Sequence, residues 1–259
     1  METMQDLFSL KGKNAVVIGG SGGIGKAIAA GLAKYGARVA IASRSLEKLK
    51  QAAEEIKAET GCSVSVYEVD STDEESIRRL ADRIRQDFGT VDILVNSQGY
   101  NIKHAALDFP MDEWDALFDV NVKGVMMCCK AFGKIMAEQK SGKIINVSSV
   151  RGIRANAGGN SAYCASKGAV DMITRTLAAE LAPHGVNVNA IGPALIATAL
   201  TYKQMQEPGR TENYVRNIPM GRIGQTSDVV GAAVFLASPA SDFVTGQIIY
   251  IDGGLTAVG

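Results

Sequence analysis

Histidine and cysteine are scarce in this chain of 259 residues. It contains two histidines and four cysteines, and no two of the cysteines stand in a CxxC spacing. Metal centres need clusters of such ligands at short spacings, so the sequence predicts no metal site. We interpret Cys62, Cys128, Cys129 and Cys164 as reduced thiols of an intracellular protein.

An excess of charge of either sign is also missing. Lys plus Arg and Asp plus Glu number 27 each, so the net charge is zero. A neutral chain has no field that would attract nucleic acid or an anionic membrane. No apolar run approaches the ~20 residues of a membrane span, and the first residues, METMQDLFSLKGK, carry charges where a secretion signal would be apolar. We therefore expect a soluble, cytoplasmic protein that acts on a small molecule, without nucleic-acid or membrane partners.

Short β-branched segments recur along the chain and alternate with longer helical patterns. Most of the short segments are apolar throughout, which is typical of strands that helices cover on both faces. The predicted strands are 14–18, 38–42, 64–69, 91–95, 143–147, 186–191 and 247–251, and the predicted helices are 27–35, 46–59, 73–88, 111–139, 162–181 and 227–237. Asp73 and Ser227 are the expected N-caps of their helices. The pattern predicts one α/β domain over residues 1–259, a Rossmann-type doubly wound sheet of about seven parallel strands with helices on both faces.

One segment does not fit this alternation. Residues 194–219 mix Gly, Pro and polar side chains directly after a predicted strand. A flap over a bound ligand has this composition, and so does an ordinary surface insertion. Both interpretations stay open, and we keep the substrate flap at 194–219 as the working prediction.

A glycine-rich turn follows the first predicted strand. Glycines at such a turn let the backbone approach a pyrophosphate and direct the N-terminus of the next helix at its negative charge. The motif alone is weak, but its place between a strand and a helix is typical of dinucleotide-binding proteins. The candidate cofactor contacts here are Gly19, Ser21, Gly22, Gly23, Ile24 and Gly25.

The end of the second predicted strand distinguishes between the two nicotinamide cofactors. NAD-specific sites place a carboxylate there, which accepts from the ribose 2′-hydroxyl. This chain has Ser43 and Arg44, which can donate to a 2′-phosphate, so we expect NADP(H) to be favoured over NAD(H). The alternative for Arg44 is a solvated residue at a helix start. Asp70, which ends the third strand, is a candidate acceptor for the adenine amino group or a cap of the following helix.

Tyr163 and Lys167 are four residues apart in a predicted helix, so they share a face. A free phenol has a pKa of ~10, and a neighbouring ammonium favours the phenolate. Such a pair can exchange a proton near neutral pH. The same spacing also arises by chance on helix surfaces.

Taken together and in this order, the motifs of the chain resemble those of the short-chain dehydrogenase/reductase family over almost the whole length. The resemblance implies that Ser149 holds the substrate oxygen, Tyr163 exchanges its proton and Lys167 lowers the pKa of Tyr163. It also implies that Asn121 helps to hold a water that relays protons. A strand-end cap at Ser149 and a core amide at Asn121 are the alternatives. The motifs that carry the resemblance are the glycine-rich turn, Asp70, Asn96-Ser97-Gln98-Gly99, Asn121, Ser148-Ser149, Tyr163 with Lys167, Ile191-Gly192-Pro193-Ala194 and Ile251-Asp252-Gly253-Gly254.

The resemblance also extends the expected cofactor site and the expected assembly. Family members usually pair two long helices into tetramers, so we expect a homotetramer. Three positions depart from the family's pattern, because Ile18, Gln98 and Ala194 stand where Thr, Ala and Gly are common. They bear on cofactor affinity and pocket shape, and none belongs to the catalytic set. The further cofactor contacts that the resemblance implies are Asn96, Gly99, Tyr163, Lys167, Pro193, Ile196 and Thr198.

Polar and basic side chains follow the fourth and fifth predicted strands. Ligands of such sheets bind at the carboxyl ends of the strands. The side chains indicate a small, hydroxyl-rich and anionic substrate such as a sugar acid, while solvated or intersubunit arginines are the alternative. The candidate substrate contacts are Gln98, Tyr100, His104, Arg151, Arg154 and Asn156.

These patterns predict an NADP(H)-dependent oxidoreductase that transfers a hydride between nicotinamide and a secondary alcohol or ketone. A 3-oxoacyl-acyl-carrier-protein reductase is the first alternative, because such proteins share the overall pattern. Related reductases often carry a basic docking residue where this chain reads Leu177-Ala178-Ala179-Glu180. A non-catalytic NADP(H)-binding sensor is a distant alternative, since such a protein would be expected to lose Tyr163 or Lys167.

Overall fold

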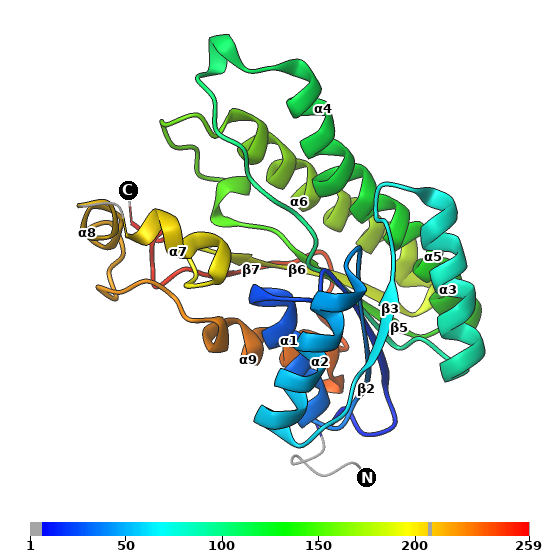
Figure 1. Ribbon diagram of the computed structural model, residues 1–259. Helices are drawn as coiled ribbons and strands as arrows, with labels where there is room; N and C mark the ends of the chain where they lie inside the picture. The colour runs from blue at the N-terminus through cyan, green and yellow to red at the C-terminus, as the bar shows by residue number, and fades with distance from the viewer. Residues whose placement is uncertain (1–6, 207–208, 259) are drawn as a thin grey trace.

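A computed structural model describes residues 7–206 and 209–258 of the protein. Its centre is a sheet of seven parallel strands in the order β3-β2-β1-β4-β5-β6-β7, with helices on both faces (Figure 1). The predicted Rossmann-type sheet is therefore confirmed, and the ends of the predicted strands shift by no more than two residues. The strands are β1 (Asn14–Ile18), β2 (Arg38–Ser43), β3 (Ser65–Glu68), β4 (Ile93–Asn96), β5 (Gly142–Val147), β6 (Val186–Pro193) and β7 (Ile248–Ile251).

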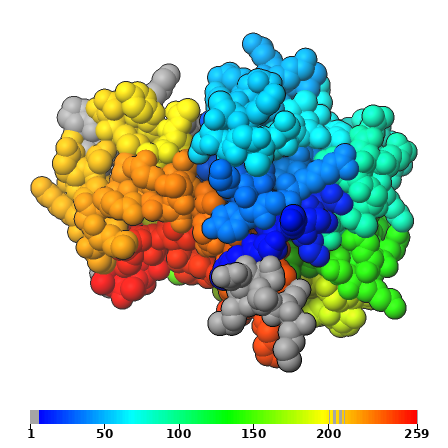
Figure 2. Space-filling view, turned by 90° about the horizontal axis from the view of Figure 1, so that it is seen from below, coloured from blue at the N-terminus to red at the C-terminus, as the bar shows by residue number. Residues whose placement is uncertain are grey.

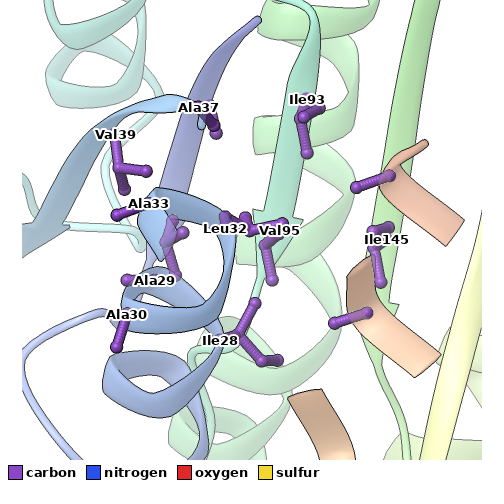
Figure 3. Packing of buried hydrophobic residues seen from close by; sticks show 14 of the residues in the cluster. Ile28, Ala29, Ala30, Leu32, Ala33, Ala37, Val39, Ile93, Val95 and Ile145 are labelled. Carbon is purple, nitrogen blue, oxygen red and sulfur yellow. The ribbon is translucent and has the colours of Figure 1, made fainter. Parts of the chain in front are cut away.

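Helices α1 (Gly23–Lys34), α2 (Leu46–Thr60) and α9 (Val230–Ala237) cover one face of the sheet. Figure 3 shows Ile28 and Leu32 of α1 directed at Val95 of β4, with alanines on the neighbouring positions of the helix. Small side chains let a helix approach its neighbours closely, and a Cβ at Gly31 would collide with Val230 of α9. This packing holds α1 directly behind the turn that follows β1.

Helices α3 (Glu74–Phe88), α5 (Gly124–Gln139) and α6 (Ser161–Leu181) cover the other face. The single helix predicted over 111–139 is wrong, because a π-helical turn, η2 (Asp119–Lys123), separates α4 (Met111–Phe118) from α5. Such a turn widens the backbone ladder and is frequent at functional sites. Here it carries Asn121, which is buried.

One of the two predicted N-caps is found in the structure and the other is not. Asp73 caps α3 as expected, since its carboxylate accepts from the backbone N–H of Glu75 at 3.0 Å. Ser227 is not a cap, because it lies inside the 3-10 turn η5 (Thr226–Val229), where Gln225 and Asp228 form the capping box. The cap therefore stands two residues earlier than the sequence indicated.

Residues 194–219 carry two short helices, α7 (Ala199–Met205) and α8 (Arg210–Val215). Figure 1 places them beside the carboxyl ends of the strands, and Figure 2 shows their yellow and orange surface next to the blue surface of α1 and α2. No helix within residues 7–206 and 209–258 is both long and apolar enough to cross a membrane. The remaining short 3-10 turns are η1 (Ala106–Asp108), η3 (Val150–Gly152), η4 (Ala182–His184) and η6 (Pro239–Ser241).

Candidate active site

A cleft of about 1720 Å³ lies at the carboxyl ends of the strands. It extends from the turn after β1, past the ends of β2 and β3, to the ends of β5 and β6 and to α7 and α8. Doubly wound sheets bind their ligands at this edge. The predicted site residues that line the cleft are Gly19, Ser21, Gly22, Gly23, Ile24, Gly25, Ser43, Arg44, Asp70, Gln98, Gly99, Tyr100, Ser149, Arg151, Asn156, Tyr163, Lys167, Pro193, Ile196 and Thr198.

The glycines of the turn after β1 serve two different purposes. Gly19 has a φ of 78°, and a Cβ there would lie 2.7 Å from the backbone nitrogen of Gln98. A Cβ at Gly25 would collide with the carbonyl oxygen of Gly19, so both residues are required for the turn itself. At Gly22, an added Cβ would have no atom of another described residue within 4 Å, its chain neighbours aside. The open side of the turn therefore lies at Gly22, the N-cap of α1, where the helix dipole favours an anion.

Two polar side chains at the end of β2, Ser43 and Arg44, line the cleft. The Ser43 hydroxyl oxygen is buried and has no hydrogen-bond partner among the described residues, so its hydrogen-bonding capacity is unused there. Arg44 is exposed and also lines the cleft. Ser45 is already used, because it caps α2 by accepting from the N–H of Lys48 at 3.4 Å.

Asp70 lines the same end of the cleft. Its Oδ1 accepts from the backbone N–H of Thr72 at 2.9 Å and from the Thr72 hydroxyl at 2.7 Å. These hydrogen bonds lower the pKa of Asp70, and the charge of Arg44 adds to the effect. Asp70 therefore closes the turn before α3 as a carboxylate, while Asp73 caps that helix.

The catalytic candidates come together from three elements. Tyr163 and Lys167 lie on the first turns of α6, and the Lys167 Nζ is 5.7 Å from the centre of the Tyr163 ring. Lys167 is 4% exposed, and its Nζ donates to the Val147 carbonyl at the end of β5 at 2.8 Å. The Ser149 Oγ accepts from the N–H of Arg151 at 3.1 Å and lies 3.4 Å from the carbonyl oxygen of Pro193.

Burial has the largest effect on the proton affinity of both catalytic groups. It raises the pKa of Tyr163, against the lowering effect of a hydrogen bond with Ser149. It lowers the pKa of Lys167 to about 8, against the raising effect of the Asp171 carboxylate. The net shift of Tyr163 is opposite in direction to the one that the sequence led us to expect, because desolvation disfavours the phenolate. Burial therefore moves the pKa values of the two groups apart, and in the free protein the Tyr163 phenol holds its proton more tightly than the Lys167 ammonium does.

Asn121 is fully hydrogen-bonded within the protein. Its Oδ1 accepts from the N–H of Tyr100 at 3.0 Å, and its Nδ2 donates to the Tyr100 carbonyl at 2.9 Å and to the Ser166 Oγ at 3.2 Å. The side chain is 0% exposed and does not line the cleft. It therefore ties the loop after β4 to α6, as the core-amide alternative describes.

Three other predicted contacts lie outside the cleft. Asn96 is a core residue whose Nδ2 donates to the Asn146 Oδ1 at 2.9 Å. The His104 Nε2 lies 2.9 Å from the Glu113 Oε2, and the Arg154 guanidinium donates to the carbonyl of Leu255. Each of these three side chains bonds to a partner within the protein, and the structure does not bring it into the cleft.

The structure also brings residues into the site that sequence reasoning missed. Thr201, Met205, Thr211 and Tyr214 of the 194–219 segment line the cleft. Asp171 lies behind Lys167 and hydrogen-bonds the Ser148 hydroxyl at 2.5 Å. No local pattern marks these residues, although Asp171 could have been noticed as an acidic residue one helical turn after Lys167.

Comparisons with known proteins show which families and enzymes this chain is similar to. The family model described as enoyl-(acyl carrier protein) reductase matches residues 19–256. A 5-keto-D-gluconate 5-reductase from Escherichia coli (strain K12) is 37% identical over 252 residues, 97% of this chain and 98% of that protein. A 3-oxoacyl-acyl-carrier-protein reductase from Thermotoga maritima is 38% identical over 246 residues, 95% of this chain and 98% of that protein.

A solved structure has the same fold. The crystal structure of a gluconate 5-dehydrogenase from Burkholderia cenocepacia J2315, in complex with NADP and tartrate, has a TM-score of 0.94 at 35% identity. The match covers 99% of this chain and 100% of that one. Fold, cleft and relatives together define an oxidoreductase that acts on CH–OH groups. The chain belongs to the short-chain dehydrogenase/reductase family, which confirms the resemblance of its motifs.

Proposed function

We propose that this enzyme uses NADP(H) to interconvert a secondary alcohol and a ketone on a hydroxyl-rich acid of the sugar-acid class. The observation that carries the proposal is the meeting of Ser149, Tyr163 and Lys167 in one cleft with the glycine-rich turn. A 5-keto-D-gluconate 5-reductase and a gluconate 5-dehydrogenase among the similar proteins support the substrate class.

The residues of the cleft fit NADP(H). The buried Ser43 hydroxyl, which has no hydrogen-bond partner within residues 7–206 and 209–258, and the exposed Arg44 that follows it are the proposed donors for a 2′-phosphate. The open side of Gly22 and the N-terminus of α1 receive a pyrophosphate. When bound, the cofactor supplies or accepts the hydride. The residues proposed for its remaining parts are Asp70 for the adenine, Gly99, Tyr163 and Lys167 for the nicotinamide ribose, and Pro193, Ile196 and Thr198 for the carboxamide.

The proton steps follow from the positions of three side chains. In reduction, the Ser149 hydroxyl donates a hydrogen bond to the carbonyl oxygen, and the Tyr163 phenol gives its proton to the alkoxide that forms. The Lys167 ammonium, oriented by the Val147 carbonyl, stabilises the phenolate that remains. Oxidation runs the same steps in reverse, with Tyr163 accepting the alcohol proton.

Arg151 provides the charge that an acidic substrate requires. It lines the cleft, and its positive charge lowers the pKa of Tyr163, so it acts at the reacting end. Its Nη1 lies 3.2 Å from the Arg154 carbonyl, which leaves further guanidinium N–H groups for a carboxylate. The segment 194–219 contributes Tyr214 and Thr211 to the same space, and we propose that it covers the substrate.

A 3-oxoacyl thioester reductase is the second candidate, because the relative from Thermotoga maritima is as similar in sequence. Exposed Ala179 and Glu180 on α6 provide no cation for an acidic carrier protein. Assembly into homotetramers and a cytoplasmic location remain predictions; Met126 and Met172, exposed on α5 and α6, would be covered in such an assembly.

A substrate panel tests the proposal. Purified enzyme is supplied with NADPH or NADH and with 5-keto-D-gluconate, a neutral ketose or an acetoacetyl thioester, while the absorbance of the reduced nicotinamide is followed. We expect the highest kcat/KM with NADPH and the keto acid. A preference for the thioester would favour the second candidate. Binding of NADPH without turnover of any ketone would indicate a cofactor sensor.

A further inference from the structure

Asp171 is a buried carboxylate that the proton steps above do not use. It stands on α6 one helical turn after Lys167 and is 2% exposed. Its Oδ1 accepts from the Ser148 hydroxyl at 2.5 Å, while its Oδ2 is buried with no hydrogen-bond partner among the described residues. A buried carboxylate with an unpaired oxygen is costly, so such a residue calls for a role.

The second oxygen lies where two further elements meet α6. A Cβ at Gly152 would collide with Oδ2, so the turn η3 packs its backbone directly against the carboxylate. On β7, the Tyr250 hydroxyl is also buried without a hydrogen-bond partner in the described part of the chain. Asp171 is among the groups that raise the pKa of Tyr250, which places the two side chains next to each other.

Strand β6 leaves room for the ring of Tyr250 at Gly192. Gly192 of β6 is the register partner of Tyr250, and a Cβ at Gly192 would lie 2.6 Å from the Cδ1 of the Tyr250 ring. Because Gly192 has no side chain, the ring can lie across β6 toward α6. The hydroxyl of Tyr250 and the Oδ2 of Asp171 are therefore complementary groups, a donor and an acceptor, enclosed together.

We propose that Asp171 is a positioning residue for catalysis, which accepts from Ser148 with Oδ1 and from Tyr250 with Oδ2 and so holds the end of β5 against α6. Ser148 stands between two residues of the proposed mechanism. The carbonyl of Val147 on one side accepts from Lys167, and the hydroxyl of Ser149 on the other side binds the substrate oxygen. A displacement of Ser148 would move both. This inference rests on the proposed function of Ser149, Tyr163 and Lys167.

The carboxylate also acts on Lys167 through its charge. The charged and titratable groups that face Asp171 are Lys167 and Arg175 on α6 and Tyr250 on β7. Lys167 and Arg175 favour the ionised form of Asp171, while burial opposes it. Asp171 in turn raises the pKa of Lys167 against the effect of burial. Removing the negative charge should therefore let the ammonium lose its proton at a lower pH.

Three variants separate the two effects. Asp171→Asn keeps an acceptor oxygen for Ser148 but removes the charge, whereas Ser148→Ala and Tyr250→Phe keep the charge and remove one hydrogen bond each. We expect kcat for ketone reduction to fall by about 10-fold or more in Asp171→Asn, with the alkaline limb of the pH profile shifted by about one unit to lower pH. Asp82→Asn, on the exposed face of α3, is the matched control and should change neither.

The outcome that overturns the proposal is an Asp171→Asn enzyme whose pH profile coincides with that of the wild type, even if it unfolds at a lower temperature. Should that variant fail to fold, Ser148→Ala and Tyr250→Phe carry the test. Each is expected to lower kcat several-fold without moving the pH limb, and unchanged kcat in both overturns the proposal.

A second readout requires no substrate. The affinity for NADPH, followed by nicotinamide fluorescence, should weaken as Lys167 loses its proton, with a midpoint near pH 8 in the wild type. In Asp171→Asn this midpoint should lie at lower pH, and an unmoved midpoint contradicts the proposal. Failure of the wild type to reduce any ketone of the panel would instead overturn the proposed function, and the titration would still report on Asp171.

Discussion

The ammonium of Lys167 lies 5.7 Å from the centre of the Tyr163 ring, one helical turn away on α6. The helix alone puts the two side chains on one face, and the Val147 carbonyl of β5 then holds the ammonium in place. Burial brings the pKa of Lys167 down to about 8, so the ammonium is sensitive to pH near neutrality. This relationship underlies the first two predictions.

Replacing Tyr163 by Phe should remove turnover and keep the fold. The phenol is the proposed proton donor, and general acid catalysis contributes about 10²- to 10⁴-fold to a rate. Reduction of the best ketone substrate should fall by at least this range, as measured by NADPH consumption. Circular dichroism and the thermal unfolding temperature serve as controls for the fold. Full activity in a folded Tyr163→Phe enzyme would disprove the mechanism.

The rate of ketone reduction should fall as the pH rises through about 8, because the Lys167 ammonium loses its proton there. Below that pH the group stays charged and the rate should be level, apart from other titrations. Initial rates at saturating NADPH from about pH 6 to about pH 10 check this. In Lys167→Arg the guanidinium keeps its proton throughout, so whatever activity remains should lack this limb. If the alkaline limb of the pH profile persists in Lys167→Arg, a group other than Lys167 causes it.

Arg44→Ala should weaken NADPH binding far more than NADH binding. The guanidinium is the proposed partner of the 2′-phosphate, and a hydrogen bond to a charged group is worth about 1.5–3 kcal/mol, which corresponds to ~10- to 100-fold in KM. Kinetics with both cofactors measure the ratio. Arg83→Ala, an exposed arginine on α3 that pairs with Asp87, is the control and should leave both KM values unchanged. Equal losses for the two cofactors would remove Arg44 from the phosphate site.

Alanine at Gly25 and at Gly22 should have different effects. A Cβ at Gly25 collides with the Gly19 carbonyl, so we expect a loss of about 1–3 kcal/mol in the free energy of unfolding. A Cβ at Gly22 meets no other atom within 4 Å in the described part of the chain, its chain neighbours aside, so stability should hold within ~0.5 kcal/mol. It would nevertheless stand in the path of the pyrophosphate, and NADPH affinity should fall by about tenfold or more, equivalent to ~1.4 kcal/mol. Urea unfolding and fluorescence titration measure the two effects, and a Gly22→Ala enzyme with normal affinity would contradict the assigned path.

Replacing each of the two arginines in the loop after β5 should have a different effect. Arg151 lines the cleft, whereas Arg154 binds the carbonyl of Leu255. Arg151→Ala should therefore raise KM for an acidic substrate by ~10-fold and leave KM for a neutral ketose unchanged. Arg154→Ala should lower stability by about 1 kcal/mol through the lost hydrogen bond and leave both KM values close to normal. If neither variant alters KM for any acidic substrate, the anionic part of the substrate assignment is wrong.

Some features of the structure could be predicted from the sequence and others could not. Its runs of β-branched residues located all seven strands, and Asp73 was recognised as a helix cap. It missed the π-helical turn at Asn121, because both flanking segments are apolar and helical in pattern. His104 and Arg154 were assigned to the substrate site on their loops alone, and the direction of a loop side chain depends on neighbours far away in the chain.

The sequence by itself determined the family, the parallel sheet and the spacing of Tyr163 and Lys167, since these follow from local patterns that repeat at fixed intervals. Only the tertiary structure decided that Asn121 binds the backbone of Tyr100, that Lys167 is held by Val147 and that Asp171 lies against Ser148 and Gly152. These contacts join residues that are 19 to 23 positions apart in the chain. Burial, which has the largest effect on the proton affinities of the site, exists only once the layers have packed.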